Sequence, residues 1–315
     1  MAEASDTLTL GGDLTVRRLG FGAMSLTGPG TWGDPRDPAE ARKVLRRAIE
    51  LGVNLIDTAD SYGPDVSERL IAEALHPYPD DLVIATKGGQ QRGGPYQWSA
   101  DGRPDSLRRA CEASLRRLRL ERIDLYQLHT VDPKVPLEES VGALSELQAE
   151  GKIRHIGISN VSLGCLARAR SVAAIVSVQN RYNLAERGSD EVLEVCGREQ
   201  LAFIPWMPLA RGTLTARRRR LDHIAAAHGA SPAQVALAWL LHRSRATLPI
   251  PGTSSVANLE ENVAARELRL TEEDLASLYQ YQPSLLERLP GRIRGKLRPL
   301  AVPILAPILS LRKRG

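Results

Sequence analysis

Cysteine is scarce in this chain of 315 residues, which contains three. Cys111, Cys165 and Cys196 lie far apart, are odd in number and form no Cys-x-x-Cys pair. The sequence therefore indicates neither a disulfide framework nor a zinc site. We expect a protein of a reducing compartment, the cytoplasm, that carries no metal.

Long apolar runs are also missing. No stretch approaches the roughly 18 consecutive apolar residues that a membrane-spanning helix needs. Met1 is followed by Ala-Glu-Ala-Ser-Asp instead of basic residues and an apolar segment. We therefore expect no secretory signal.

Positive charge is concentrated at one end of the chain. The whole chain carries a net charge of +5, yet residues 284–315 hold eight basic residues and one acidic residue, so the remainder is slightly acidic. An acidic body argues against nucleic acid as a partner. We predict one domain over residues 1–282, followed by a basic, proline-containing extension over residues 283–315.

Two interpretations of this extension stay open. Residues 300–311 are largely apolar and flanked by cations, but Pro303 and Pro307 disfavour one continuous helix. The segment is either a partly disordered tail or strap on the domain, or an anchor with weak affinity for an anionic membrane surface.

Apolar runs rich in β-branched residues alternate with helical patterns from about residue 16 to about residue 282. Apolar side chains recur at helical spacing in between, for example at Ala41, Val44, Leu45 and Ala48. Ser231 and Thr271 each have a matching polar residue three positions later, which is typical of a helix start. The strand candidates are residues 17–22, 53–58, 82–86, 123–128, 153–159, 175–179, 201–206 and 247–251.

Short apolar strands that are each followed by a helix pair in parallel. Eight such units in about 265 residues match the size of a closed (β/α)₈ TIM barrel. The alternative is an open, doubly wound sheet, which would ordinarily place a third glycine after Gly20-Phe21-Gly22, and that glycine is missing. Residues 8–16 turn at Gly11-Gly12 and predict a β-hairpin that caps the N-terminal face of the barrel.

Polar or aromatic residues end six of the predicted strands, and in a barrel all of them would face one mouth. Each has an ordinary explanation by itself: Asp57 as a helix cap, Lys87 as a loop cation, His129 as a core histidine and Tyr62 as wall packing. Together these four residue types form an arrangement that can protonate a carbonyl oxygen. The strand-end residues are Asp57, Lys87, His129, Ser159-Asn160, Gln179-Asn180 and Trp206.

From about Leu19 to Tyr281 the sequence resembles the aldo-keto reductase superfamily. The spacing of Asp57, Tyr62, Lys87 and His129 carries the resemblance, together with Gly157-Ile158-Ser159-Asn160 and Gly252-Thr253-Ser254-Ser255. The resemblance implies that the first four residues are the catalytic tetrad and that Ser159, Asn160 and Gln179 bind a nicotinamide carboxamide. The sequence looks most like bacterial members, some of which are pyridoxal reductases.

The cofactor that the resemblance implies is NADP(H), with NAD(H) as an alternative. Free N–H groups at the helix start after Gly252 favour a 2′-phosphate, whereas two positions that are often basic in the family are Gly252 and Asn258 here. Trp206 takes the place of a stacking aromatic ring. The expected cofactor-binding residues are Gly22, Met24, Ser159, Asn160, Gln179, Trp206, Pro208, Leu209, Arg211, Gly212, Gly252, Thr253, Ser254, Asn258, Glu261 and Asn262.

The expected reaction is the reduction of an aldehyde or ketone to an alcohol, with hydride from nicotinamide and a proton from Tyr62. Negative charge grows on the carbonyl oxygen in the transition state, so a proton donor must be in place. An ammonium beside a tyrosine stabilises its phenolate, which is the role we expect for Lys87, with Asp57 holding Lys87 and His129 orienting the substrate oxygen.

The substrate is a small carbonyl compound in this interpretation. Trp32 and Trp98 suggest a substrate pocket for a flat ring, and pyridoxal is one candidate among aromatic and aliphatic aldehydes. Two other functions stay open: a non-catalytic, nicotinamide-binding regulatory subunit, and a lyase or isomerase barrel, which would need a metal cluster or a phosphate site. The oligomeric state is open, with a monomer as our expectation.

Overall fold

The computed structural model describes residues 6–212 and 219–280, without the side chains of residues 211, 219 and 220. The predicted extension at 283–315 lies outside these residues. The strands are β1 (Thr7–Leu10), β2 (Leu14–Arg17), β3 (Phe21–Gly22), β4 (Leu55–Asp57), β5 (Val83–Gly88), β6 (Gln90–Gly94), β7 (Gln97–Ala100), β8 (Ile123–Leu128), β9 (Ile153–Ser159), β10 (Ile175–Gln179) and β11 (Ala202–Phe203). The helices are η1 (Ala23–Leu26), α1 (Pro38–Glu50), α2 (Val66–Leu75), α3 (Pro104–Leu118), α4 (Leu137–Ala149), α5 (Leu163–Arg170), α6 (Asp190–Arg198), η2 (Ala210–Gly212), α7 (Arg219–Ala227), α8 (Pro232–Arg243), α9 (Val256–Ala264) and α10 (Glu272–Tyr279).

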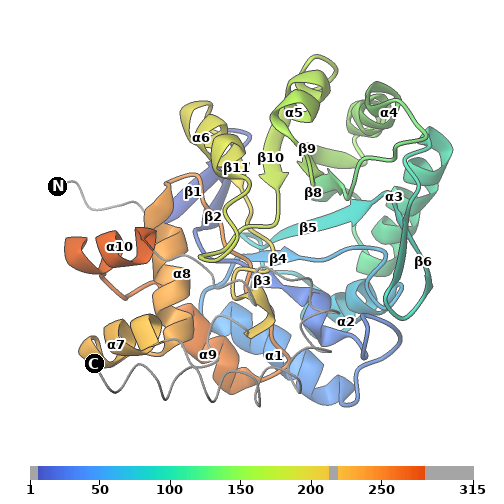
Figure 1. Ribbon diagram of the computed structural model, residues 1–315. Helices are drawn as coiled ribbons and strands as arrows, with labels where there is room; N and C mark the ends of the chain where they lie inside the picture. The colour runs from blue at the N-terminus through green and yellow to red at the C-terminus, as the bar shows by residue number, and fades with distance from the viewer. Residues whose placement is uncertain (1–5, 213–218, 281–315) are drawn as a thin grey trace, which may run out of the picture.

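A parallel sheet of seven strands, in the order β11-β10-β9-β8-β5-β4-β3, forms the centre of the molecule. Helices surround this sheet as an outer ring (Figure 1). The segment 247–251 closes the circle, because Leu248 N–H donates to Phe203 O at 2.8 Å and Gly20 N–H donates to Pro249 O at 2.9 Å. The fold is the (β/α)₈ barrel that the sequence predicts.

The last predicted strand forms this closure without a regular ladder. Pro249 and Pro251 have no N–H, so on the side facing β3 they serve only as acceptors. Gly22 N–H donates to Pro251 O at 3.4 Å. The closure of the barrel therefore rests on a few hydrogen bonds from both neighbouring strands.

Apolar side chains fill the N-terminal end of the barrel. The strands β1 and β2 pair in antiparallel fashion and turn at Gly11 and Gly12, whose φ angles are 59° and 85°. Leu10, Leu14 and Val16 of this hairpin are buried in one cluster with inward-facing residues of the barrel strands. The predicted N-terminal cap is therefore confirmed, and polar groups are left to gather at the opposite mouth.

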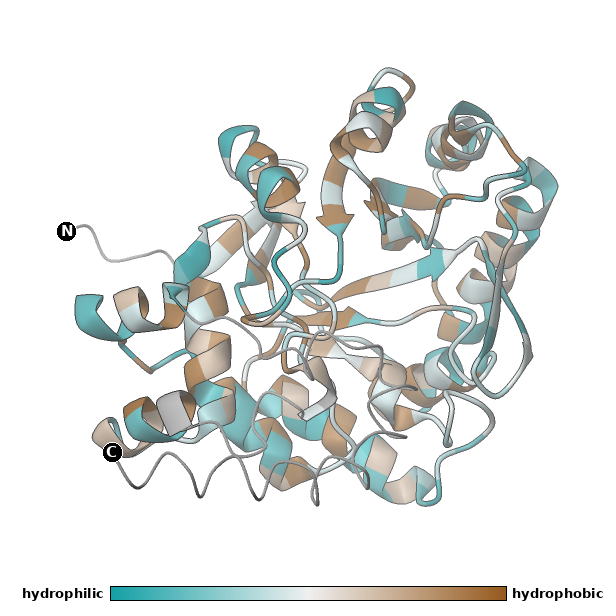
Figure 2. Ribbon diagram, viewed as in Figure 1, coloured by the Kyte–Doolittle hydropathy of each residue, from teal (hydrophilic) through white to brown (hydrophobic). Residues whose placement is uncertain are grey.

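A second, larger apolar cluster lies between the strands and the helices. Figure 2 shows apolar residues on the central strands and on the helix faces that turn toward them. In α1 the buried residues are Ala41, Val44, Leu45 and Ala48, as their spacing predicts. The caps at Ser231 and Thr271 are both capping boxes.

One element is not predicted by the sequence. The strands β6 and β7 form an antiparallel hairpin inserted between β5 and α3, at the mouth end of the barrel.

Within the described residues no single helix is long and apolar enough to cross a membrane; α7 and α8 pass that test only as a bent pair.

Replacement of Leu10 by alanine tests the cap. Leu10 is 1% exposed inside the barrel end, so Leu10→Ala should lower the free energy of unfolding by about 2–4 kcal/mol, measured by urea denaturation. Thr9→Val, at an exposed position of the same strand, should change it by no more than about 0.5 kcal/mol. Equal effects of the two substitutions would show that the hairpin is not packed into the barrel.

Candidate active site

Four polar side chains that lie far apart in the sequence meet at the mouth of the barrel. Asp57 is the last residue of β4, Lys87 lies near the end of β5, and His129 follows β8 directly. Tyr62 lies in the loop between β4 and α2. All four are buried, with exposures between 0% for Lys87 and 7% for Tyr62 and His129.

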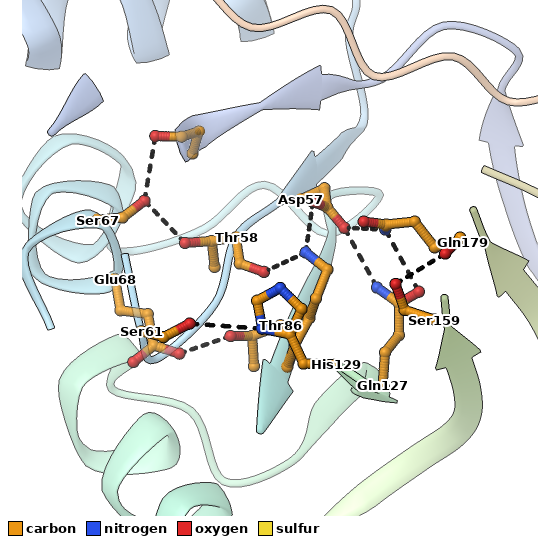
Figure 3. Close-up of polar contacts among 12 residues, drawn as sticks. Asp57, Thr58, Ser61, Ser67, Glu68, Thr86, Gln127, His129, Ser159 and Gln179 are labelled. Atoms are coloured by element: carbon orange, nitrogen blue, oxygen red, sulfur yellow. Dashed lines mark hydrogen bonds and ion pairs between the residues drawn. The ribbon is translucent and has the colours of Figure 1, made fainter. Parts of the chain in front are cut away.

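Lys87 is the most deeply buried of the four. Its Nζ donates to Asp57 Oδ1 at 2.6 Å and to Thr58 O at 2.7 Å. The dashed lines that reach Asp57 and Thr58 in Figure 3 include these two hydrogen bonds. The amine also lies 5.2 Å from the centroid of the Tyr62 ring. The structure thus brings Lys87 together with both Asp57 and Tyr62.

The charge of Lys87 is stabilised by its neighbours. Burial alone would lower the pKa of the Lys87 ammonium, but the Asp57 carboxylate and Tyr62 outweigh burial, so the net pKa is raised. Burial raises the pKa of the Tyr62 phenol more than Lys87 lowers it. The net direction for Tyr62 differs from the lowering expected from an adjacent ammonium, because the apolar surroundings are the larger effect. The phenol therefore keeps its proton at neutral pH.

His129, unlike Lys87, is uncharged. Burial and then the nearby Lys87 ammonium hold the pKa of His129 well below its usual 6.5, so the imidazole is neutral. Its Nδ1 lies 3.4 Å from Ser61 Oγ (Figure 3). The ring centroids of Tyr62 and His129 are 5.7 Å apart, in an edge-to-face arrangement.

Two buried amides hold the second carboxylate oxygen of Asp57. Gln179 Nε2 donates to Asp57 Oδ2 at 2.8 Å, and Gln127 Nε2 donates to the same oxygen at 3.2 Å (Figure 3). Gln127 was not among the predicted site residues. The sequence feature that could have indicated Gln127 is its place as a polar residue in an otherwise largely apolar strand. It lies two positions before His129 and therefore on the same strand face.

The residues expected to bind a carboxamide lie side by side. Ser159 Oγ donates to Gln179 O at 2.7 Å, and Asn160 Nδ2 donates to His129 O at 3.0 Å. Trp206 Nε1 donates to Asn160 Oδ1 at 3.0 Å. Trp206 is therefore fixed at the wall by the same amide that contacts the backbone of His129.

A cavity of about 1050 Å³ runs from the buried tetrad to α9. Asp57, Tyr62 and His129 line one end of it, and Lys87 lies behind the wall. Trp98 also lines the cavity, whereas within the described residues Trp32 and Ser254 do not. The expected cofactor-binding residues that line it are Gly22, Met24, Ser159, Asn160, Gln179, Trp206, Pro208, Leu209, Gly212, Gly252, Thr253, Asn258, Glu261 and Asn262. The side chain of Arg211 lies outside the described part of the structure.

Several lining residues were not expected. Ser25 follows Met24, and Arg181 follows Asn180. Both could have been predicted only because they are next in sequence to residues expected at the barrel mouth. Gln90 belongs to the hairpin that the sequence did not predict. The other unexpected lining residues are Thr130, Met207, Pro232, Ala233, Ile250 and Pro251.

The cavity wall has features that suit a long, polar cofactor. The Oγ of Ser25 is buried and has no hydrogen-bond partner among the described residues. A Cβ at Gly22 would lie 2.6 Å from Ile250 O, and a Cβ at Gly252 would meet Gly22 O. These glycines allow β3 and the closing segment to approach each other along the cavity. No group of three or more His, Cys, Asp or Glu that could hold a metal ion occurs within the described ranges.

Comparisons with known proteins agree with this geometry. Residues 18–282 match the Aldo/keto reductase family. The chain is 47% identical over 281 residues to pyridoxine 4-dehydrogenase of Escherichia coli, covering 87% of this chain and 98% of that protein. It is 48% identical over 267 residues to an uncharacterized oxidoreductase of Schizosaccharomyces pombe, covering 85% of this chain and 87% of that protein.

A solved structure is also similar. The structure of an aldo-keto reductase from Klebsiella pneumoniae in complex with NADPH matches with a TM-score of 0.75 and 28% sequence identity, covering 91% of this chain and 96% of that one. The sequence match, the structural match and the barrel all lead to the same conclusion: this chain belongs to the aldo/keto reductase family.

Proposed function

We propose that this chain reduces an aldehyde or ketone to an alcohol, with Tyr62 as the proton donor and a nicotinamide cofactor in the cavity. The observation that carries the proposal is the Tyr62 side chain at the cavity wall, with the Lys87 amine 5.2 Å and the His129 ring 5.7 Å from the centroid of its ring. When bound, the nicotinamide supplies the hydride.

Tyr62 and Lys87 act on the carbonyl oxygen in this proposal. The oxygen becomes negative as its carbon is reduced, and a proton from the Tyr62 hydroxyl neutralises it. The phenolate that remains lies beside the Lys87 ammonium, which stabilises it where water cannot. Asp57 keeps Lys87 charged and in place through the 2.6 Å hydrogen bond.

His129 orients the same oxygen. If Ser61 Oγ donates to Nδ1, the proton of the neutral imidazole resides on Nε2. A neutral ring donates this N–H to the substrate without adding a second positive charge beside Lys87. The proposal therefore assigns proton transfer to Tyr62 and positioning to His129.

The other end of the cavity suits the adenosine part of the cofactor. Asn258, Glu261 and Asn262 of α9 line this end, whereas Trp206 offers its aromatic face beside Asn160, at the end proposed for the nicotinamide. We propose NADPH as the preferred cofactor, with NADH as an alternative, because the start of α9 offers free N–H groups to a phosphate. The NADPH complex of the Klebsiella protein supports this assignment.

Pyridoxal is the substrate we propose to test first. The relative from Escherichia coli is named for the dehydrogenation of pyridoxine, and dehydrogenation of an alcohol is the reverse of the reduction of the corresponding aldehyde. The aromatic rings of Tyr62, Trp98 and His129 meet at the substrate end of the cavity, with centroids 5.7–6.4 Å apart. These rings suit a flat, aromatic aldehyde.

Removal of the Tyr62 hydroxyl tests the proton donor. Tyr62→Phe should lower kcat for aldehyde reduction at least about 100-fold, because the general acid is lost. The dissociation constant for NADPH, measured by fluorescence, should not change. As a control, Tyr126→Phe removes the hydroxyl of another buried tyrosine, which lies outside the cavity lining, and should retain activity. Near-normal turnover of Tyr62→Phe would overturn the assignment.

The protonation state of His129 can be tested by the pH dependence of stability. Above the usual pKa of 6.5 both the folded and the unfolded protein hold a neutral imidazole. Below it the unfolded chain takes up a proton that the folded protein does not, so stability contributed by the neutral ring is lost. The difference in free energy of unfolding between the wild type and His129→Gln should therefore fall by up to about 1.4 kcal/mol per pH unit below about pH 6.5. A constant difference from about pH 8 to about pH 5 would contradict a depressed pKa.

A cation at position 258 tests the site of the 2′-phosphate. Asn258 is exposed and lines the cavity, whereas a side chain at Gly252 would meet Gly22 O. Asn258→Arg should lower the KM for NADPH about threefold to tenfold and leave the KM for NADH within about twofold, by a charge-assisted contact. Ala257→Arg adds the same charge to the same helix outside the cavity lining and should change neither value. A wild type that strongly prefers NADH would refute the NADPH assignment.

A further inference from the structure

The hairpin of β6 and β7 stands at the mouth of the barrel with little apolar support. No residue between 90 and 100 belongs to either buried apolar cluster. Tyr96 and Trp98 are 61% and 39% exposed. Hydrophobic burial therefore does not fix where this hairpin lies, and polar contacts must do so.

Arg92 supplies most of these contacts. Its guanidinium donates to Thr31 O at 2.6 Å, to Gly30 O at 2.8 Å and to Ser61 O at 3.0 Å. The same group donates to two carbonyls of its own hairpin, at residues 94 and 97. All five N–H donors of the guanidinium are used. Apart from Arg92, the backbone N–H of Tyr96 donates to Gly30 O at 3.3 Å.

The same guanidinium holds Trp98. Arg92 and Trp98 are directly opposite each other across the hairpin, so their side chains share one face. The guanidinium carbon lies 3.6 Å from the centroid of the Trp98 ring, which is close stacking. The ring of Trp32 lies on the guanidinium as well, at 5.6 Å. Trp32 thus supports Arg92.

Trp98 in turn faces the reacting end of the cavity. Its ring centroid is 6.4 Å from that of Tyr62 and 6.4 Å from that of His129, both edge-to-face. Trp98 lines the cavity together with Tyr62 and His129. A carbonyl compound that reaches the Tyr62 hydroxyl must place the rest of its structure near this indole.

We propose that Arg92 is a positioning residue that fixes Trp98 as the aromatic wall of the substrate end of the cavity, and that this wall selects flat, aromatic aldehydes over small aliphatic ones. This inference rests on the proposed carbonyl reduction. Arg92 acts through Trp98, on which its guanidinium stacks across the hairpin. Lysine cannot replace it, since an ammonium has three donors and no planar face to stack on the indole.

The test compares flat and small aldehydes with NADPH. For Arg92→Gln, kcat/KM for pyridoxal and benzaldehyde should fall about fivefold to tenfold through KM, whereas kcat/KM for propanal should change less than about twofold. Arg92→Lys and Trp98→Ala should show the same selective loss. Trp98→Phe keeps a flat ring and should retain most of the preference. In the double variant Arg92→Gln/Trp98→Ala the loss should equal that of Trp98→Ala alone, because one residue acts through the other.

The control and the contradicting outcomes are distinct. Arg168→Gln removes an arginine of α5 that is paired with Glu138 of α4, away from the cavity lining, and should leave every rate unchanged. Additive losses in the double variant, or equal losses for all three aldehydes, would overturn the inference while leaving carbonyl reduction intact. A wild type without activity on any aldehyde would overturn the proposed function and this inference with it. If Arg92→Gln does not fold, Arg92→Lys provides the same comparison.

Discussion

The wholly buried ammonium of Lys87 is the constraint on which the site depends. Removing such a charge from water costs several kcal/mol unless an opposite charge and further hydrogen bonds replace the lost hydration. Asp57 and Thr58 O provide this replacement. Asp57 in turn needs partners for its second oxygen, which Gln127 and Gln179 supply. One buried charge therefore requires side chains from four strands, β4, β5, β8 and β10, to end at the same place.

The register of the sheet satisfies that requirement. Lys87 is paired with Gln127 between β5 and β8, and Gln127 is paired with Gly157 between β8 and β9. A Cβ at Gly157 would lie 2.8 Å from Cγ of Gln127, so a glycine is needed where the amide crosses the barrel. A shift of one residue in any of these pairs would turn the polar group to the other face of its strand. The catalytic geometry proposed here is thus set by strand pairing.

The sequence predicted the bounds of the central strands well. It predicted poorly the strands near the closure of the barrel and the inserted hairpin. The bounds of β8, β9 and β10 agree with their predicted ranges, because isoleucine, valine or leucine recurs through each strand and a polar residue follows it at the barrel mouth. β11 is shorter than predicted, and residues 247–251 form only the closing contacts, since proline interrupts the donors of the closing segment. Gln90-Gln91-Arg92-Gly93-Gly94 has neither β-branched residues nor an apolar alternation, so nothing local predicted the β6–β7 hairpin.

The site shows a similar division between local and tertiary information. Asp57, Lys87 and His129 were recognisable because polar residues that end apolar strands meet at one mouth of a barrel. Gln127 was not recognisable in the same way, because its partner Asp57 is 70 residues away. Arg92 was hidden for the same reason: the carbonyls of Gly30 and Thr31 that it binds lie about 60 residues earlier.

The proposed catalytic end of the cavity, around Lys87, and its proposed substrate wall, at Trp98, are held in place by different means. Asp57, Lys87 and His129 lie at the ends of strands whose positions are set by two apolar cores and by a buried ion pair. Trp98 lies on an exposed hairpin, and Arg92 supplies most of the polar contacts that hold this hairpin to the rest of the chain. Under the proposed function, changes in that hairpin would alter which carbonyl compounds fit and would leave the pair of Lys87 and Asp57 in place. This is the arrangement in which a barrel keeps one reaction and varies its substrates, because the wall is carried by a βα segment outside the core.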